Sequence, residues 1–148
     1  MAGYERAWRD GDLDAVAELF TEDARYIVPT TDARDGDAGT TLVLLEDNLS
    51  RIKGRVARLS SRRAHREFPS SRTRRLVTNV SIVDVEGDTV TINANFTVWR
   101  FRRGETQTYV GRYIYRLVRA GDGFLIRLRR AELDNEALRP HGTLSIIV

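Results

Sequence analysis

The sequence contains no cysteine and only two histidines, His65 and His141. Without cysteine the chain lacks the thiolate ligands that iron–sulfur clusters need. The histidines also lie too far apart in the sequence to indicate a facial triad for mononuclear iron. Asp32, Asp35 and Asp37 share one Asp- and Gly-rich segment but lack the spacing of a calcium-binding loop. The sequence therefore predicts no metal site and no cofactor in this chain.

Long apolar runs are missing as well. No run approaches the roughly 20 residues that a helix needs to cross a bilayer. Residues 1–6 contain no apolar signal segment, and the absence of cysteine agrees with a reducing compartment. We therefore expect a cytoplasmic protein that is not associated with a membrane.

Lysine is almost absent, because Lys53 is the only lysine among 24 basic residues. The sequence pI of about 9.7 raises the question of nucleic-acid binding. However, the arginines alternate with apolar residues, and 21 acidic residues balance them without any isolated basic block. We therefore predict no binding to nucleic acid. Arginine is instead well suited to bidentate ion pairs across a subunit interface.

The first half of the sequence predicts helices. A length of 148 residues fits one domain, residues 1–148, with one hydrophobic core. The apolar spacing predicts a short helix ending near Trp8, a helix over residues 13–20, a strand over 24–28, a loop over 30–39 and a helix from about 40 to 53. Pro29 is expected to end the strand.

After Pro69 the hydrophobic pattern changes to a period of two. In residues 89–101, Val90, Ile92, Ala94, Phe96 and Val98 face one way, and polar residues face the other. Strands are also expected over 109–118 and 124–133, joined by glycine-containing turns. Helices followed by long antiparallel strands indicate an α+β fold, with the helices packed on one face of a strongly curved, mostly antiparallel sheet.

Three segments, taken in order, carry a family resemblance. In residues 68–80 a Pro-Ser turn precedes three arginines and an apolar strand; the basic segment 51–59 comes before it, and an apolar tail, 144–148, ends the chain. From about Trp8 to Val148 the sequence resembles the β (small) subunit of Rieske-type aromatic-ring-hydroxylating dioxygenases. The fold of that family, a cone described as cystatin-like or NTF2-like, fits the predicted elements.

The resemblance implies a structural role rather than a catalytic one. In that family the β subunits form a trimer in an α3β3 hexamer, and the catalytic α subunit holds the Rieske [2Fe–2S] cluster and the mononuclear iron. We therefore expect an oxygenase α subunit as partner and self-association as a trimer. The residues expected at the subunit interface are Arg72, Arg74, Arg75, Asn93 and Asn95, because guanidinium and amide groups suit hydrogen bonds to a partner.

A second hypothesis is a stand-alone enzyme or small-ligand binder of the cyclase, dehydratase or isomerase type. Similar dehydratase-like proteins use a His–Asp dyad, but our alignment places Arg75 and Arg9 at those positions. Arginine cannot act as a general base, so we assign no catalytic residue. If the cone contains a pocket, the residues expected to line it are Trp8, Tyr26, His65, Trp99, Tyr113 and Tyr115. The alternative for these aromatic residues is ordinary core packing.

Overall fold

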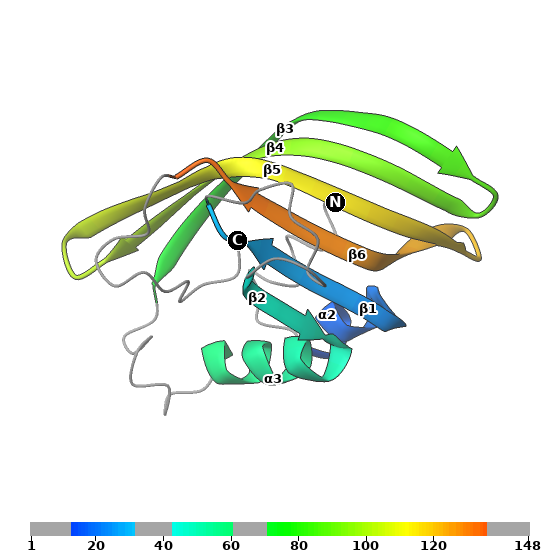
Figure 1. The fold of residues 1–148 in the computed structure, drawn as a ribbon. Helices are drawn as coiled ribbons and strands as arrows, with labels where there is room; N and C mark the ends of the chain where they lie inside the picture. The colour runs from blue at the N-terminus through cyan, green and yellow to red at the C-terminus, as the bar shows by residue number, and fades with distance from the viewer. Residues whose placement is uncertain (1–12, 32–42, 61–70, 136–148) are drawn as a thin grey trace.

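Residues 13–31, 43–60 and 71–135 are described in the computed structural model of the chain (Figure 1). In chain order the elements are α2 (Leu13–Glu18), β1 (Phe20–Pro29), β2 (Val43–Asn48), α3 (Leu49–Ser60), β3 (Arg72–Glu86), β4 (Thr89–Arg102), β5 (Glu105–Ala120) and β6 (Gly123–Leu133). The six strands form one sheet in the order β2-β1-β6-β5-β4-β3. Only β1 and β6 pair in parallel among these neighbours. The predicted α+β class with a mostly antiparallel sheet is confirmed.

The predicted helix over residues 40–53 is wrong in its first half. Val43–Asn48 form β2 and pair antiparallel with β1, so the helix α3 begins only at Leu49. Asn48 explains the boundary, because its Oδ1 accepts a hydrogen bond of 3.0 Å from the backbone N–H of Arg51. This is the contact of an N-cap residue, which the hydrophobic spacing of Leu42, Leu45 and Leu49 alone did not reveal.

Tight turns with positive φ join the long strands as the sequence predicts. Gly87 lies in the β3–β4 turn at φ 56°, and Gly121 lies in the β5–β6 turn at φ 57°. The β4–β5 turn places Arg103 at φ 50° and Gly104 at φ 78°. Consecutive residues with positive φ are typical of a two-residue hairpin whose twist matches that of its strands.

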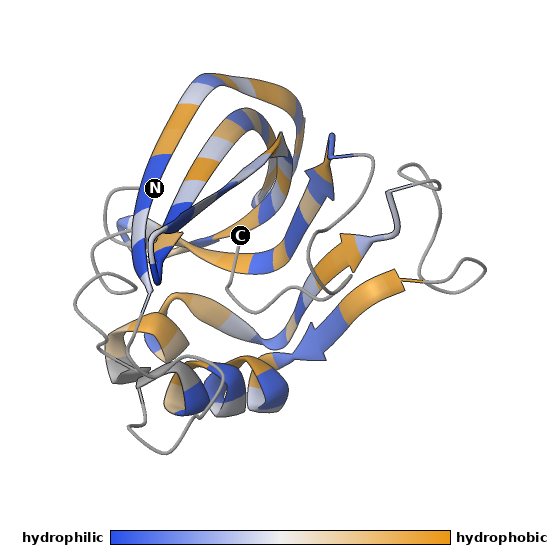
Figure 2. Ribbon diagram, turned by 90° about the vertical axis from the view of Figure 1, so that its left-hand side faces the viewer, coloured by the Kyte–Doolittle hydropathy of each residue, from blue (hydrophilic) through white to orange (hydrophobic). Residues whose placement is uncertain are grey.

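The two faces of the sheet differ in what they contact. The inner face lies toward α2 and α3, and the outer face lies on the other side (Figure 1). Hydrophobic and hydrophilic residues alternate along the long strands (Figure 2). On β4, Ala94, Phe96 and Val98 are buried on the inner face, where Phe96 and Val98 join a core with Val56 of α3 and Val16 of α2. The predicted inward direction of these β4 residues is confirmed.

Bulges on β3 and β6 change the direction of side chains along these two strands. On β3, Asn79 and Val80 lie between the pairs Thr78↔Asn95 and Ser81↔Asn93, and Val83 forms a second irregularity before Asp84↔Thr91. Asn79 adopts φ 51°, a conformation that asparagine tolerates better than most residues. On β6, Arg127 lies between residues paired with Arg116 and Leu117 of β5. A bulge bends its strand and interrupts the regular ladder.

Gly111 of β5 lies where β6 approaches most closely. A Cβ at this position would overlap the backbone oxygen of Glu132 and lie 2.9 Å from its carbonyl carbon. We expect Gly111→Ala to lower the free energy of unfolding by about 3 kcal/mol, because backbone rather than a flexible side chain must move. Gly54→Ala in α3 is the matched control: nothing lies within 4 Å of its Cβ, and alanine should stabilise the helix by about 0.5–1 kcal/mol. Denaturant unfolding measures both, and equal effects would contradict the packing described.

Candidate functional site

Three of the residues expected to line a pocket lie together on the inner face. Tyr26 of β1 and Tyr113 and Tyr115 of β5 are all buried and belong to the core. Trp99 does not join them, because it lies between the buried inner-face residues Val98 and Arg100 of β4 and therefore belongs to the outer face. Trp8 and His65, the other two expected residues, lie outside the described residues.

The centre of this cluster is Arg129 of β6, which is 0% exposed. Its guanidinium carbon lies 4.6 Å from the ring centroid of Tyr113, 5.5 Å from that of Tyr26 and 5.6 Å from that of Tyr115. Phe96 completes the packing by stacking on Tyr113, with centroids 4.1 Å apart. A buried guanidinium among three tyrosine rings gains cation–π attraction that partly offsets its lost hydration. We call these four residues, Tyr26, Tyr113, Tyr115 and Arg129, the tyrosine–arginine cluster.

The residue pattern of the sequence did not indicate that Arg129 is buried on the inner face. Strict alternation along Phe124–Leu133 places Ile126 and Leu128 on the apolar face and Arg129 on the polar face. The bulge at Arg127 reverses this phase, so that Ile126 and Arg129 are both buried. No glycine or proline marks the bulge, and the only signal is that Leu125, Ile126 and Leu128 cannot all share one face of a regular strand.

The cluster offers no base for chemistry near neutral pH. Burial raises the pKa of Tyr26 to about 12, although the positive charge of Arg129 acts in the opposite direction. Tyr26 is therefore a neutral phenol at physiological pH, and Arg129 carries its proton at any working pH. These groups can pack, donate hydrogen bonds and attract electron-rich rings, but they cannot abstract a proton.

The three arginines expected at the interface divide between the two faces. Arg72 pairs in register with Phe101 and Arg74 with Trp99, which places both on the outer face, where they are exposed. Arg75 pairs with the buried Val98, so it lies on the inner face and is half-buried. Only Arg72 and Arg74 therefore present their charge on the face away from the helices.

The two asparagines lie on the outer face beside an ion-pair network. Asn95 is exposed and Asn93 is half-buried. Asn95 is in register with Arg112 of β5, whose Nε donates to Glu132 Oε2 at 3.0 Å. Arg130 donates to the other oxygen of the same carboxylate at 2.7 Å. This network joins β5 to β6, and leaves Asn95 among polar groups that can hydrogen-bond a partner.

Neither a metal site nor a membrane span is found in the part of the chain that the structure describes. Among residues 13–31, 43–60 and 71–135, no three His, Asp or Glu side chains gather as metal ligands. Within the same residues, no helix combines the length and apolar character needed to cross a bilayer.

Arg129 can be tested against Arg127, which lies two residues earlier on the same strand. Arg129→Ala should lower the free energy of unfolding by about 3 kcal/mol or more, because it leaves a cavity among the tyrosines and removes their cation–π contacts. Arg127→Ala removes only a 3.3 Å surface ion pair with Asp23 and should leave the free energy of unfolding nearly unchanged. Thermal and denaturant unfolding measure both variants, and similar losses would contradict a structural role for Arg129.

The pKa of Tyr26 makes stability depend on alkaline pH. The unfolded chain releases this phenolic proton near pH 10, whereas the folded chain retains it to about pH 12. The folded state therefore binds more protons in this window, and stability falls as the pH rises from 10 to 12. A shift of this size corresponds to roughly 2–3 kcal/mol. Tyr26→Phe should flatten the decline between pH 10 and 12, measured by urea unfolding; an unchanged slope would refute the assignment.

Comparison with known proteins places this surface in context. The family described as "Ring hydroxylating beta subunit" matches residues 6–140. The small oxygenase component of the p-cumate 2,3-dioxygenase system of Pseudomonas putida is 42% identical over 131 residues, which cover 88% of this chain and 73% of that protein. The family match thus spans nearly all of the chain.

Solved structures share the fold. The β subunit of the benzoate 1,2-dioxygenase from Burkholderia mallei has a TM-score of 0.74 at 24% identity, over 94% of this chain and 89% of that one. An NTF2-like protein with a cystatin-like fold from Novosphingobium aromaticivorans has a TM-score of 0.63 at 23% identity, over 92% and 78% of the two chains. These structures confirm the predicted NTF2-like architecture. Together with the family match, they lead to one conclusion: the chain belongs to the family of ring-hydroxylating dioxygenase β subunits.

Proposed function

We propose that this chain is the non-catalytic assembly subunit of a Rieske non-haem iron ring-hydroxylating dioxygenase. Its 42% identity with a small oxygenase component over 88% of the chain carries the proposal. Family membership implies association with an oxygenase α subunit. The Rieske cluster and the mononuclear iron belong to that partner, because a chain without cysteine lacks the ligands for the cluster.

The proposed complex is an α3β3 hexamer built on a trimer of this chain. In it, the β trimer holds the α subunits in register, so that electrons pass from the cluster of one α subunit to the iron of its neighbour. Arg72, Arg74, Asn93 and Asn95 on the outer face are the proposed contact residues, while Arg75 supports the inner face. The interior packing of the tyrosine–arginine cluster supports a scaffold, and the relatives do not favour the stand-alone enzyme.

The cellular location and the domain organisation are part of the same proposal. We assign the complex to the cytoplasm, and we propose one domain over residues 1–148 that binds neither nucleic acid nor membrane. The α subunit selects the substrate. The relative from P. putida is a component of a p-cumate 2,3-dioxygenase system. We therefore choose p-cumate, a para-substituted aromatic acid, as the first compound to test.

Co-expression with the α subunit encoded beside this chain tests the proposal. We expect the purified chain alone to form a trimer and the co-expressed chains to form an α3β3 hexamer, both measured by light scattering coupled to size-exclusion chromatography. Metal analysis of the separated chains should find all the iron with α. The hexamer should oxidise an aromatic acid when supplied with an electron-transfer partner, whereas the β trimer alone should not.

Two results would overturn the assembly role. The first is a chain that remains separate from α under all conditions while α forms an active oligomer by itself. The second is turnover of an aromatic substrate by the purified β chain without α.

A further inference from the structure

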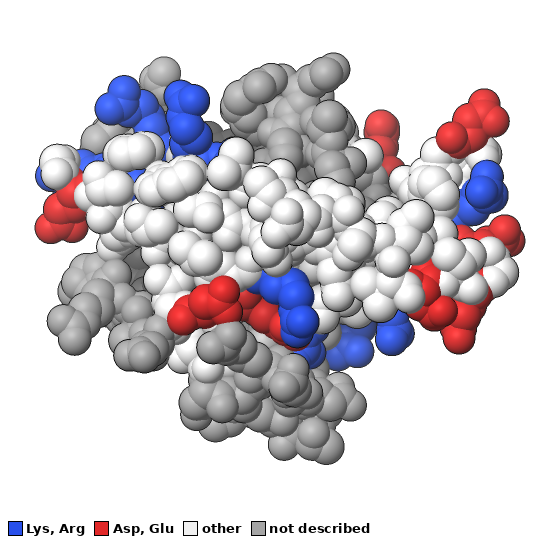
Figure 3. Space-filling model, turned by 90° about the horizontal axis from the view of Figure 1, so that it is seen from above, with Lys and Arg blue, Asp and Glu red and all other residues white. Residues whose placement is uncertain are grey.

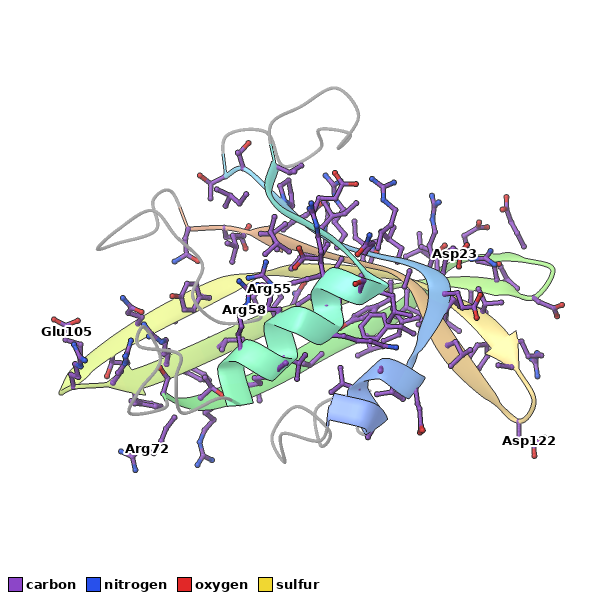
Figure 4. All side chains as sticks on the ribbon, turned by 90° about the horizontal axis from the view of Figure 1, so that it is seen from below. Asp23, Arg55, Arg58, Arg72, Glu105 and Asp122 are labelled. Atoms are coloured by element: carbon purple, nitrogen blue, oxygen red, sulfur yellow. The ribbon has the colours of Figure 1, made fainter. Side chains whose placement is uncertain are left out.

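The two ends of the long strands carry opposite charge. Exposed acidic residues gather at the end with the β3–β4 and β5–β6 turns: Asp84, Glu86, Asp88 and Asp122, with Arg116 and Arg119 as basic neighbours. At the other end lie the exposed Arg72, Arg74 and Arg103, with Glu105 as an acidic neighbour. Figure 4 shows Arg72 and Asp122 at opposite ends of the sheet; in Figure 3 acidic groups gather at one end, with some basic groups among them, and basic groups gather at the other.

These opposite charges do not neutralise each other within one chain. Arg72, Arg74, Asp84 and Glu86 form no ion pair or side-chain hydrogen bond with other described residues. The 14 residues of β4 separate the two ends by roughly 45 Å, which is several times the Debye length of about 8 Å at physiological ionic strength. Each end therefore presents an uncompensated charge to a partner.

The acidic end also exposes apolar side chains. Val80, Ile82, Val83 and Val85 of β3 are 55%, 66%, 57% and 60% exposed. Ile82 pairs with Ile92, which packs against the core, so this apolar surface continues the inner face of the sheet. We call Val80, Ile82, Val83, Asp84, Val85 and Glu86 the acidic tip. Asp84 and Glu86 pair in register with Thr91 and Thr89, so their carboxylates lie on the outer face, across the strand from Ile82. An edge that exposes apolar and charged side chains together is typical of a protein contact site.

The opposite end has a matching surface on the outer face. Arg72 and Arg74 pair in register with Phe101 and Trp99, and Leu76 lies two residues further along β3. Leu76 is 54% exposed and Phe101 is 37% exposed. We call these five residues, Arg72, Arg74, Leu76, Trp99 and Phe101, the basic patch. Arginine and aromatic residues are enriched at the centres of protein interfaces.

We propose that the acidic tip of one copy of this chain docks onto the basic patch of a second copy, head to tail. Both halves of the contact are present on one chain, and their charges and apolar groups are complementary. A two-fold contact through either surface would instead place like charges against each other. Repeating a head-to-tail contact closes a ring when the rotation permits. This inference rests on the self-association proposed above and assigns the residues that mediate it.

Side chains rather than strand pairing would form this contact. β3 is an edge strand, and an edge strand can in principle extend its sheet into a neighbouring chain. However, the bulges at Asn79–Val80 and Val83 interrupt the regular ladder within the tip. Charge reversal is therefore the appropriate test, because it changes the side chains and leaves the backbone intact.

Three charge variants test the contact. Asp84→Arg/Glu86→Arg reverses the acidic tip, and Arg72→Glu/Arg74→Glu reverses the basic patch. Each should weaken self-association by roughly 100-fold, because like charges then face each other. The quadruple variant, with both ends reversed, should regain most of the wild-type affinity, since its two ends are complementary again. Sedimentation velocity over a range of concentrations measures all of them, and circular dichroism checks that each is folded.

A matched control reverses charge elsewhere. Arg51→Glu/Lys53→Glu on α3 changes the net charge by the same amount as the basic-patch variant at two exposed positions, and should leave self-association unchanged. Restoration in the quadruple variant excludes unfolding as the cause of dissociation.

The binding of each variant to the α subunit is measured in parallel, and it distinguishes loss of self-association from loss of α binding. The inference is overturned if the single-end variants remain assembled, if the quadruple variant stays dissociated, or if the wild-type chain is monomeric. It is also overturned if the tip variant keeps its self-association but loses α, because the tip would then be the α site. In each of these cases the broader assembly role stands as long as the wild-type chain joins α.

Discussion

The burial of Arg129 is the constraint on which the rest of the structure depends. A guanidinium removed from water is costly unless its surroundings compensate, and three tyrosine rings provide part of that compensation. The bulge at Arg127 delivers Arg129 to the inner face, and the stacking of Phe96 on Tyr113 fixes one wall of its site. The inner face of the sheet around Arg129 therefore holds one buried positive charge in a fixed position. Close packing of this kind favours a rigid interior, whereas a substrate site needs space that can adapt to its ligand.

The tyrosine–arginine cluster occupies part of the inner face, and the outer face and the ends of the strands are the other described surfaces to consider for function. The outer face carries the network of Arg112, Arg130 and Glu132, which joins β5 to β6 beside Asn95. A rigid sheet with surfaces of this kind suits a protein that positions other subunits. The family to which the chain belongs is that of ring-hydroxylating dioxygenase β subunits.

The sequence predicted the strands well and the cluster poorly, for reasons that particular residues illustrate. Alternation along β4 was sufficient to assign the inner face, because no bulge interrupts its pairing with β5. Helical spacing misled at Leu42–Leu49, since Leu45 is buried in a strand and the cap at Asn48 separates that strand from α3. Arg129 was missed because a bulge has no local sequence mark, and the division of Arg74 and Arg75 between two faces depends on strand register. The register of a strand depends on how it pairs across the sheet, so the residue pattern of one strand does not reveal it.

The edge strand β3 connects this architecture to assembly. A long exposed edge with four aliphatic side chains would promote aggregation in a protein that acts alone. Here the two bulges limit strand-to-strand pairing, and Asp84 and Glu86 place negative charge beside the aliphatic surface. A surface protected in this way rejects copies that approach edge to edge but accepts a positively charged partner surface. In the assembly proposed above, the same features that limit aggregation select the orientation in which subunits meet, so that one strand supplies both properties.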